Sequence, residues 1–136
     1  MKTVFVDTNV FIRYLTNDDP VKADGVDKLL VKAANGEITL ITAEVVLAEV
    51  IWVLESFYGL KKNAIGPMIK AILITPGLKV INGSLVAKAI DYYLFHNIDF
   101  IDGYISALME KEKIDSIFSY DKKHLSRIKF IKRKEP

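Results

Sequence analysis

The chain alternates short apolar runs, typical of buried strands, with longer segments that carry apolar residues at helical spacing. The first short run, Val4-Phe5-Val6, is β-branched and aromatic. Strands are predicted at 4–6, 38–41, 78–81 and 116–120, with a possible edge strand at 129–131. Helices are predicted at 11–15, 20–34, 43–58, 84–95 and 97–112. This alternation predicts an α/β fold, a three-layer α/β/α sandwich around a central, mostly parallel sheet of about five strands.

Capping residues and prolines mark several expected helix ends. Asp19 precedes Pro20, the order of a capping residue followed by proline at the first helical position. Thr42 is the candidate N-cap of the long apolar helix that follows it. Pro67 lies within the segment 60–74, whose composition is otherwise helical. Since proline removes a helical hydrogen bond, we expect a kink there or a helix that starts late.

Length and composition predict one domain, residues 1–136, and restrict the metal ligands it can offer. The chain has no Cys and only two histidines, His96 and His124. Thiolate sites are therefore excluded and a multi-histidine zinc site is not expected, so a metal would have to be held by carboxylates. No signal peptide or apolar run of membrane-spanning length is present, which leads us to expect a soluble cytoplasmic protein.

Positive charge is concentrated near the C-terminus. Residues 122–134 contain seven Lys or Arg and no acid, whereas the other twelve Lys or Arg face seventeen Asp or Glu, a net charge of −5. Such a basic segment on an acidic body could hold the backbone of a polyanion near an acidic centre. A solvated tail is the simpler interpretation of the same charges.

Asp7 stands directly after the first predicted strand and is followed by Thr8 and Asn9. In an open α/β sheet, ligands bind just beyond the carboxyl ends of the strands. A carboxylate beside a hydroxyl and an amide suits a hard cation or a phosphate at that place. The alternative is that Asp7 or Thr8 only caps the next helix, and these residues alone leave both interpretations open.

Glu49 interrupts a helix that is otherwise apolar on nearly every side. Burying a lone carboxylate costs several kcal/mol unless it is paired or bound to a metal. Glu49 therefore either occupies the one solvated stripe of the helix or points into a polar pocket, and we expect the pocket.

Three further acids follow in the second half of the chain. Asp99 and Asp102 stand three residues apart at a helix start, where Asp99 suits the N-cap position. Asp102 is then in the first turn, with its carboxylate able to project past the edge of the sheet. Asp121 follows the strand predicted at 116–120, as Asp7 follows the first strand, and Ser119 stands two residues before it.

Several carboxylates brought together repel one another, and burial raises their pKa values. Mg²⁺ or Mn²⁺ makes such a group tolerable, because these ions prefer oxygen ligands. Two such ions can activate a water and stabilise the leaving oxygen of a phosphodiester. The acid-rich pattern therefore suggests metal-dependent phosphodiester hydrolysis.

The opening Val4-Phe-Val-Asp-Thr-Asn-Val-Phe-Ile-Arg-Tyr-Leu15 resembles the start of the PIN-domain family. Three later pieces also resemble it: Leu47-Ala-Glu-Val50, Ile98-Asp-Phe-Ile-Asp-Gly-Tyr-Ile-Ser-Ala107 and Phe118-Ser-Tyr-Asp-Lys-Lys-His124. Their order and spacing agree with the family over essentially the whole chain. The resemblance implies a PIN-like sandwich and a Mg²⁺- or Mn²⁺-dependent endoribonuclease. Small stand-alone members are toxins of VapBC toxin–antitoxin pairs.

The resemblance also implies roles for single residues and partners. Its four acidic positions match Asp7, Glu49, Asp102 and Asp121, of which Asp7 and Asp102 are expected to be direct metal ligands. Its supporting polar positions match Thr8, Asn9 and Ser119. The implied partners are an RNA substrate, a VapB-type antitoxin and a second copy in a homodimer, and no membrane. The antitoxin groove is expected on the apolar surface of residues 43–74.

Other functions fit the residues less well. A phosphoryl-transfer enzyme of the haloacid-dehalogenase kind needs a second aspartate two positions after Asp7, where this chain has Asn9. A receiver-like signalling domain has no need of Glu49 in an apolar helix. A catalytically inactive PIN-like module that only binds RNA or a partner is the main alternative. Dependence on a divalent metal distinguishes it from the nuclease.

Overall fold

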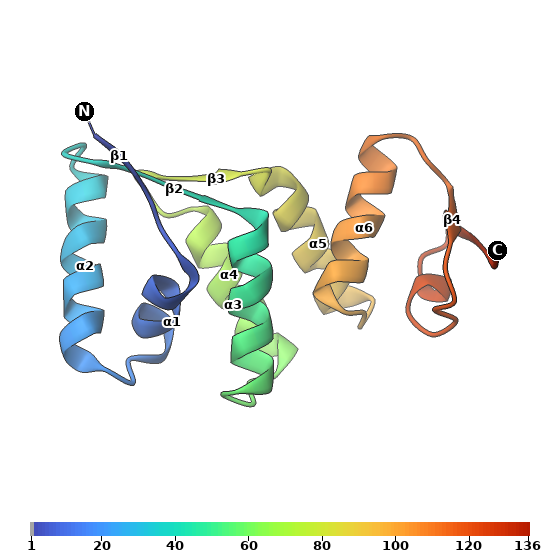
Figure 1. Cartoon of the computed structure of the whole chain (residues 1–136), viewed down its shortest axis with the longest axis horizontal. Helices are drawn as coiled ribbons and strands as arrows, with labels where there is room; N and C mark the ends of the chain where they lie inside the picture. The colour runs from blue at the N-terminus through green and yellow to red at the C-terminus, as the bar shows by residue number, and fades with distance from the viewer. Residues whose placement is uncertain (1) are drawn as a thin grey trace. The chain divides into compact units, whose positions relative to one another are not determined.

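The fold is described from a computed structural model of the chain, which covers residues 2–136. The chain divides into two compact units, one ending at Gly83 and the other running from Ser84 to Pro136, and each is described by itself. Colour in Figure 1 follows the chain from blue to red, with the N-terminal unit in blue to yellow. None of the helices formed by residues 2–136 has the length and apolar character needed to cross a membrane.

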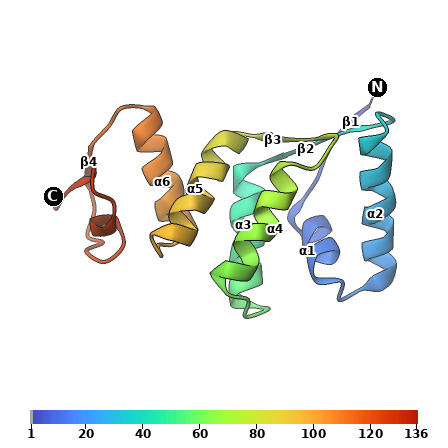
Figure 2. The same ribbon diagram turned by 180° about the vertical axis from the view of Figure 1, so that it is seen from behind.

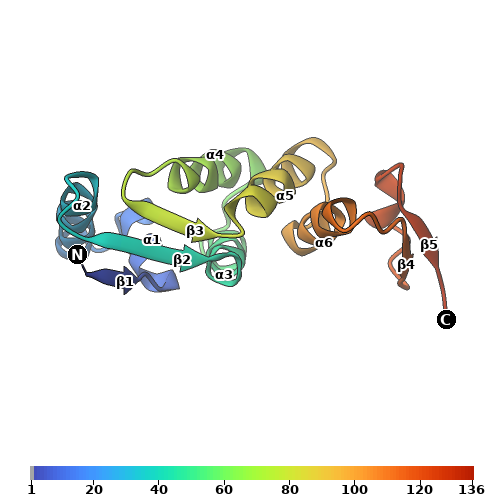
Figure 3. The ribbon, with the colours of Figure 1, turned by 90° about the horizontal axis from the view of Figure 1, so that it is seen from above.

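The N-terminal unit is built on a three-stranded parallel sheet. Its strands are β1 (Thr3–Phe5), β2 (Thr39–Ala43) and β3 (Leu78–Ile81), in the order β1-β2-β3. Figure 3 shows them side by side with β2 in the middle. Leu40 and Thr42 of β2 are fully buried, while Thr39, Ile41 and Ala43 are only partly covered. The sheet therefore buries one face more completely than the other, as expected for alternating side chains.

Four helices belong to this unit: α1 (Thr8–Thr16), α2 (Pro20–Ala34), α3 (Glu44–Ser56) and α4 (Lys62–Leu73). In Figures 1 and 2 all four extend from the same side of the sheet. Helix α1 packs against both α2 and α3. The core is formed by apolar residues of α1, β2, α3 and α4, among them Phe11, Ile12, Leu40, Leu47, Val50, Ile51, Leu54, Ile65 and Ile69.

The C-terminal unit contains α5 (Gly83–Phe95), α6 (Phe100–Lys111), a short 3-10 helix η1 (Leu125–Arg127) and two parallel strands. These strands are β4 (Ser116–Phe118) and β5 (Lys132–Lys134). A cluster of buried side chains joins the start and end of α6 to the C-terminal segment: Ile98, Met109, Leu125, Ile128 and Ile131. This cluster fixes the loop after β4 against α6.

The α/β class and the parallel strands are confirmed. Residues 2–136 contain five strands, divided between a three-stranded and a two-stranded sheet. Asp19 caps α2 as predicted, since its carboxylate accepts a hydrogen bond from the backbone N–H of Lys22 at 3.2 Å. Pro67 lies inside α4, which already begins at Lys62, so the late helix start is wrong.

Two predicted details near strands are also wrong. Thr42 does not cap α3, because β2 continues to Ala43 and the Thr42 hydroxyl donates to the carbonyl of Val6 at 3.0 Å. This bond satisfies a buried hydroxyl that would otherwise be costly. The last strand is not at 129–131 but at Lys132–Lys134, because Ile131 is taken up by the core of the C-terminal unit.

The basic C-terminal segment is folded into the C-terminal unit, although most of its Lys and Arg side chains are exposed to solvent. Its residues 132–134 pair with β4, and the backbone N–H of Lys132 donates to the carbonyl of Asp115 at 2.7 Å. The guanidinium of Arg133 donates to the carbonyl of Ser119 at 2.8 Å. Positive charge is thus fixed to the strand that leads into Asp121.

Replacing Gly103 by Ala is expected to destabilise the C-terminal unit. An added Cβ would lie 2.8 Å from the carbonyl oxygen of Ala89 on α5 and 3.3 Å from Cβ of Tyr92, so the two helices would have to separate. Such overpacking costs about 1–3 kcal/mol, to be measured by urea unfolding.

The matched control is Gly25→Ala in α2, where an added Cβ meets nothing within 4 Å. Because glycine is a poor helix former, this substitution is expected to stabilise the protein by about 0.5–1 kcal/mol. Equal effects of the two substitutions on the free energy of unfolding would contradict the close approach of α5 and α6 at Gly103.

Candidate functional site

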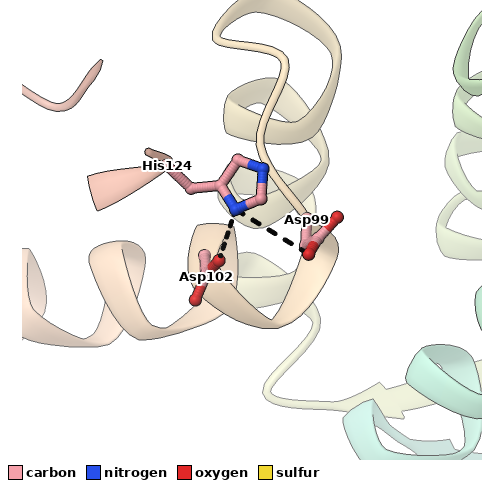
Figure 4. A group of neighbouring side chains, drawn as sticks. All are labelled: Asp99, Asp102 and His124. Carbon is pink, nitrogen blue, oxygen red and sulfur yellow. Dashed lines mark ion pairs between the residues drawn. The ribbon is translucent and has the colours of Figure 1, made fainter. Parts of the chain in front are cut away.

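Four titratable side chains converge in the C-terminal unit. Asp99 precedes α6, Asp102 is in its first turn, Asp121 follows β4, and His124 precedes η1. The Nδ1 atom of His124 lies 3.4 Å from Oδ2 of Asp102, 3.5 Å from Oδ2 of Asp121 and 3.9 Å from Oδ2 of Asp99. Figure 4 shows the imidazole facing both Asp99 and Asp102. We refer to these four residues as the acidic cluster.

A turn held by Asp121 positions one side of the acidic cluster. Its Oδ1 accepts hydrogen bonds from the backbone N–H of Lys123 at 2.9 Å and of His124 at 3.0 Å. The hydroxyl of Ser119 accepts a hydrogen bond from the backbone N–H of Asp121 at 3.0 Å. With Oδ1 engaged in this turn, Oδ2 of Asp121 is the oxygen that faces His124.

Helix α6 positions the other side. Its buried residues, which include Phe100, Gly103 and Ser106, place Asp102 at the margin of the core, where the side chain is 22% exposed. The Ser106 hydroxyl donates to the carbonyl of Asp102 at 2.7 Å, one turn further along the helix. The first turn of α6 is therefore anchored beneath the carboxylate.

The two central carboxyls have opposite pKa shifts. Burial raises the pKa of Asp102 above its ordinary value, and the neighbouring charge and hydrogen bond of Asp121 raise it further. The backbone N–H of His124, helped by that of Lys123, lowers the pKa of Asp121. Asp102 is thus the carboxyl whose negative charge is disfavoured, and a cation placed beside it would remove that cost.

The donors of the acidic cluster fit a divalent cation. One donor atom each from Asp99, Asp102 and His124 all lie within 4.8 Å of one another. At a metal–oxygen distance of about 2.1 Å, neighbouring ligands of an octahedral ion are about 3.0 Å apart and opposite ligands about 4.2 Å. The contacts of 3.4 to 3.9 Å around His124 Nδ1 lie between these values, so small side-chain movements would bring the donors to octahedral spacing.

Asp99 does not have the capping role expected of it. It occupies the N-cap position of α6, but its side chain makes no capping hydrogen bond and is 70% exposed. Its carboxylate is turned toward His124 instead. His124 ends the last of the family-like motifs but was given no role in the site from the sequence, although it follows Asp121 by three residues, the spacing of one turn.

In the N-terminal unit, Asp7 caps α1. Its Oδ1 accepts a hydrogen bond from the backbone N–H of Thr8 at 2.7 Å, and its side chain is exposed. Thr8 is buried and Asn9 is exposed. Capping engages one carboxylate oxygen, so the structural role of Asp7 leaves its second oxygen for a ligand.

Glu49 is exposed on α3, and its expected place in a polar pocket stays a prediction. Val45 and Trp52, about one turn to either side, are 69% and 64% exposed. The buried residues Leu47, Val50 and Leu54 occupy the other sides of the helix. Glu49 thus belongs to the one solvated stripe of an otherwise apolar helix.

The structure brings together two of the four predicted acids, Asp102 and Asp121, with Ser119 supporting the second. Asp7 and Glu49 lie in the N-terminal unit with Thr8 and Asn9. A pocket formed by all four carboxylates remains a prediction.

Comparison with known proteins gives one family. The family model described as PIN domain matches residues 4–131. Among solved structures, the crystal structure of VapC20 from Mycobacterium tuberculosis, described as a Sarcin-Ricin loop cleaving toxin, is similar at 19% sequence identity and a TM-score of 0.41. The match covers 90% of this chain and 92% of that one. A search of curated proteins gives no match.

Asp102→Asn is expected to stabilise the protein in EDTA at neutral pH. Because the folded state raises the pKa of Asp102, it binds the proton more tightly than the unfolded chain, and stability falls as the pH rises through this interval. The amide removes that loss. We therefore expect the melting temperature of Asp102→Asn at pH 7 to lie above that of wild type, as measured by thermal unfolding.

The gain should vanish near pH 3, where Asp102 is protonated in both states. Asp121→Asn is the opposing control. Because the folded state lowers the pKa of Asp121, its charge stabilises the fold at neutral pH, so this variant should be less stable than wild type at pH 7. An Asp102→Asn gain that is the same at pH 3 and pH 7 would show that Asp102 is not destabilised by its charge.

Proposed function

The chain belongs to the PIN-domain family, and on that premise we propose that it is a Mg²⁺- or Mn²⁺-dependent endoribonuclease, the toxin of a VapBC toxin–antitoxin pair. The observation that supports this most is the convergence of Asp102 and Asp121 on one small volume, with an elevated pKa at Asp102. Perturbed carboxyls in a small cluster are typical of functional sites. We propose that the protein acts in the cytoplasm.

The proposed roles follow the family pattern. Asp7 and Asp102 hold the divalent ion directly, and Glu49 and Asp121 complete the pocket. Asp121 also accepts the hydrogen bonds that hold the turn in which it lies, and the Ser119 hydroxyl accepts a hydrogen bond from the backbone of that turn. Thr8 and Asn9 support Asp7. The ion, when bound, supplies an activated water and charge stabilisation for the leaving oxygen.

The basic segment is suited to hold RNA phosphates beside this site. Arg127 and Arg133 donate to backbone carbonyls, and Lys132 pairs with Asp115 at 3.3 Å. The remaining cations of the segment have no ion pair within residues 2–136: Lys122, Lys123, Lys129 and Lys134. Lys122 and Lys123 directly follow Asp121, so phosphates bound by them would lie near the acidic cluster.

We propose an apolar hollow of the N-terminal unit as the binding place of a VapB-type antitoxin. It has a volume of about 330 Å³ and is lined by apolar side chains of α1, α2 and α4, among them Leu29, Leu30, Met68, Ala71 and Ile72. Only the α4 part falls in the region 43–74 expected from the sequence. A homodimer is proposed from the family pattern alone.

The test of the nuclease is cleavage of a structured RNA pool by the purified protein with Mg²⁺, Mn²⁺ or EDTA. Asp102→Asn and Asp7→Asn are each expected to lower the cleavage rate by about a hundredfold or more, because each removes a charge that holds the ion. Asparagine keeps the oxygen with which Asp7 caps α1, so loss of activity is not explained by loss of the cap.

The matched control is Asp27→Asn on an exposed position of α2, which should leave cleavage unchanged. Cleavage that persists in EDTA or in the Asp102 variant would refute the mechanism. Binding of RNA without cleavage or metal dependence would favour the inactive binding module.

Removing Lys122 and Lys123 together is expected to weaken RNA binding mainly at low salt. Each phosphate contact on a single strand contributes about 0.7 to the slope of log affinity against log salt, so the double Ala variant should lose about 1.4 of that slope. Lys28→Ala is the control, since Lys28 pairs with Asp24 on α2 at 3.1 Å. An unchanged slope would show that these lysines do not contact phosphate.

A further inference from the structure

His124 is one of only two histidines in the chain, and its imidazole is held among three carboxylates. Its backbone N–H donates to Asp121, and the next residue, Leu125, is 2% exposed in the core of the C-terminal unit. The side chain of His124 is 23% exposed. The backbone of His124 is therefore held on both sides, and the Nδ1 atom of its imidazole is turned to Asp99 and Asp102 (Figure 4).

This arrangement adds a nitrogen to a set of oxygen donors. An all-carboxylate group suits Mg²⁺, Ca²⁺ and Mn²⁺ alike, whereas imidazole nitrogen suits transition metals. A neutral imidazole can be a ligand only through a ring nitrogen that carries no proton. Nδ1 is the ring nitrogen that lies within 3.4 to 3.9 Å of the three carboxylates, so it is the atom placed for that role.

We propose that His124 Nδ1 is a metal ligand, together with the carboxylates of Asp99 and Asp102, and that it makes the site prefer Mn²⁺ over Mg²⁺. The inference rests on the proposed function in that Asp102 is shared with the proposed nuclease site. The inference goes beyond the proposed function in three respects. It names His124 as a nitrogen ligand, Asp99 as a further oxygen ligand, and Mn²⁺ as the preferred metal. Asp121 keeps its role in the turn that presents His124.

A second role for His124 has to be distinguished, that of a counter-charge for the carboxylates. A counter-charge would be displaced when a cation enters, and its removal would change the affinities for Mg²⁺ and Mn²⁺ by the same factor. A ligand is retained and contributes to the Mn²⁺ affinity more than to the Mg²⁺ affinity. The ratio of the two affinities separates these roles.

His96 offers a matched control. It is exposed at the end of α5, with its ring edge-to-face against Tyr92 at a centroid distance of 5.2 Å. It makes no contact with the carboxylates Asp99, Asp102 or Asp121 in the described structure. Since the two histidines give the only imidazole signals, each can be followed separately by NMR.

The first experiment titrates the wild-type protein with Mn²⁺ alone, without RNA, while the imidazole NMR signals of both histidines are recorded. Because broadening by paramagnetic Mn²⁺ falls steeply with distance, we expect the His124 signals to broaden at lower Mn²⁺ concentrations than those of His96. His124 signals that stay sharp when the site is saturated would overturn the proposal. This measurement needs no variant, so it does not depend on the folding of one.

The second experiment measures the Mn²⁺ and Mg²⁺ affinities of wild type, His124→Asn and His96→Asn by calorimetry. In His124→Asn we expect the ratio of Mn²⁺ to Mg²⁺ affinity to fall at least about fivefold, and in His96→Asn to stay unchanged. A fall of both affinities by the same factor would reject the ligand role. Cleavage assays are separate: a His124 signal broadened by Mn²⁺ without RNA cleavage would leave the metal site standing and would count against the nuclease only for the RNAs tested.

Discussion

The Asp121 carboxylate holds the turn on which the candidate site depends. One oxygen accepts from the backbone N–H groups of Lys123 and His124, which leaves the other facing the imidazole. The same turn leads into η1, whose Leu125 anchors it in the core beside α6. Without these bonds His124 would not face Asp102 across the loop, and the acidic cluster would lose two of its four members.

The acidic cluster places a charge where the fold disfavours it. Asp102 and Asp121 lie close enough for each to change the pKa of the other, and burial disfavours the charge of Asp102. A fold selected for stability alone would have no reason to keep that charge. The cost is explained if a cation occupies the site, because the ion stabilises the charged form and the folded state together.

The sequence predicted the parts of the fold that depend on local pattern. The strands of the N-terminal unit and the proximity of Asp102 to Asp121 follow from apolar runs ended by polar residues, and the Asp19 cap follows from the proline after it. The sequence did not predict the features that depend on the packing of side chains. The apolar composition of α3 could not tell that Glu49 lies on its exposed stripe, and Ile131 could belong to a strand or to the core until its neighbours were known.

The most direct test of the central claim, that the acidic cluster binds a divalent ion, is the melting temperature of the protein as Mn²⁺ is added. A ligand that binds only the folded state stabilises it progressively with concentration. We predict that Mn²⁺ raises the melting temperature of wild type by several degrees and leaves that of Asp102→Asn nearly unchanged. An equal rise in both proteins, or none in wild type, would contradict the account.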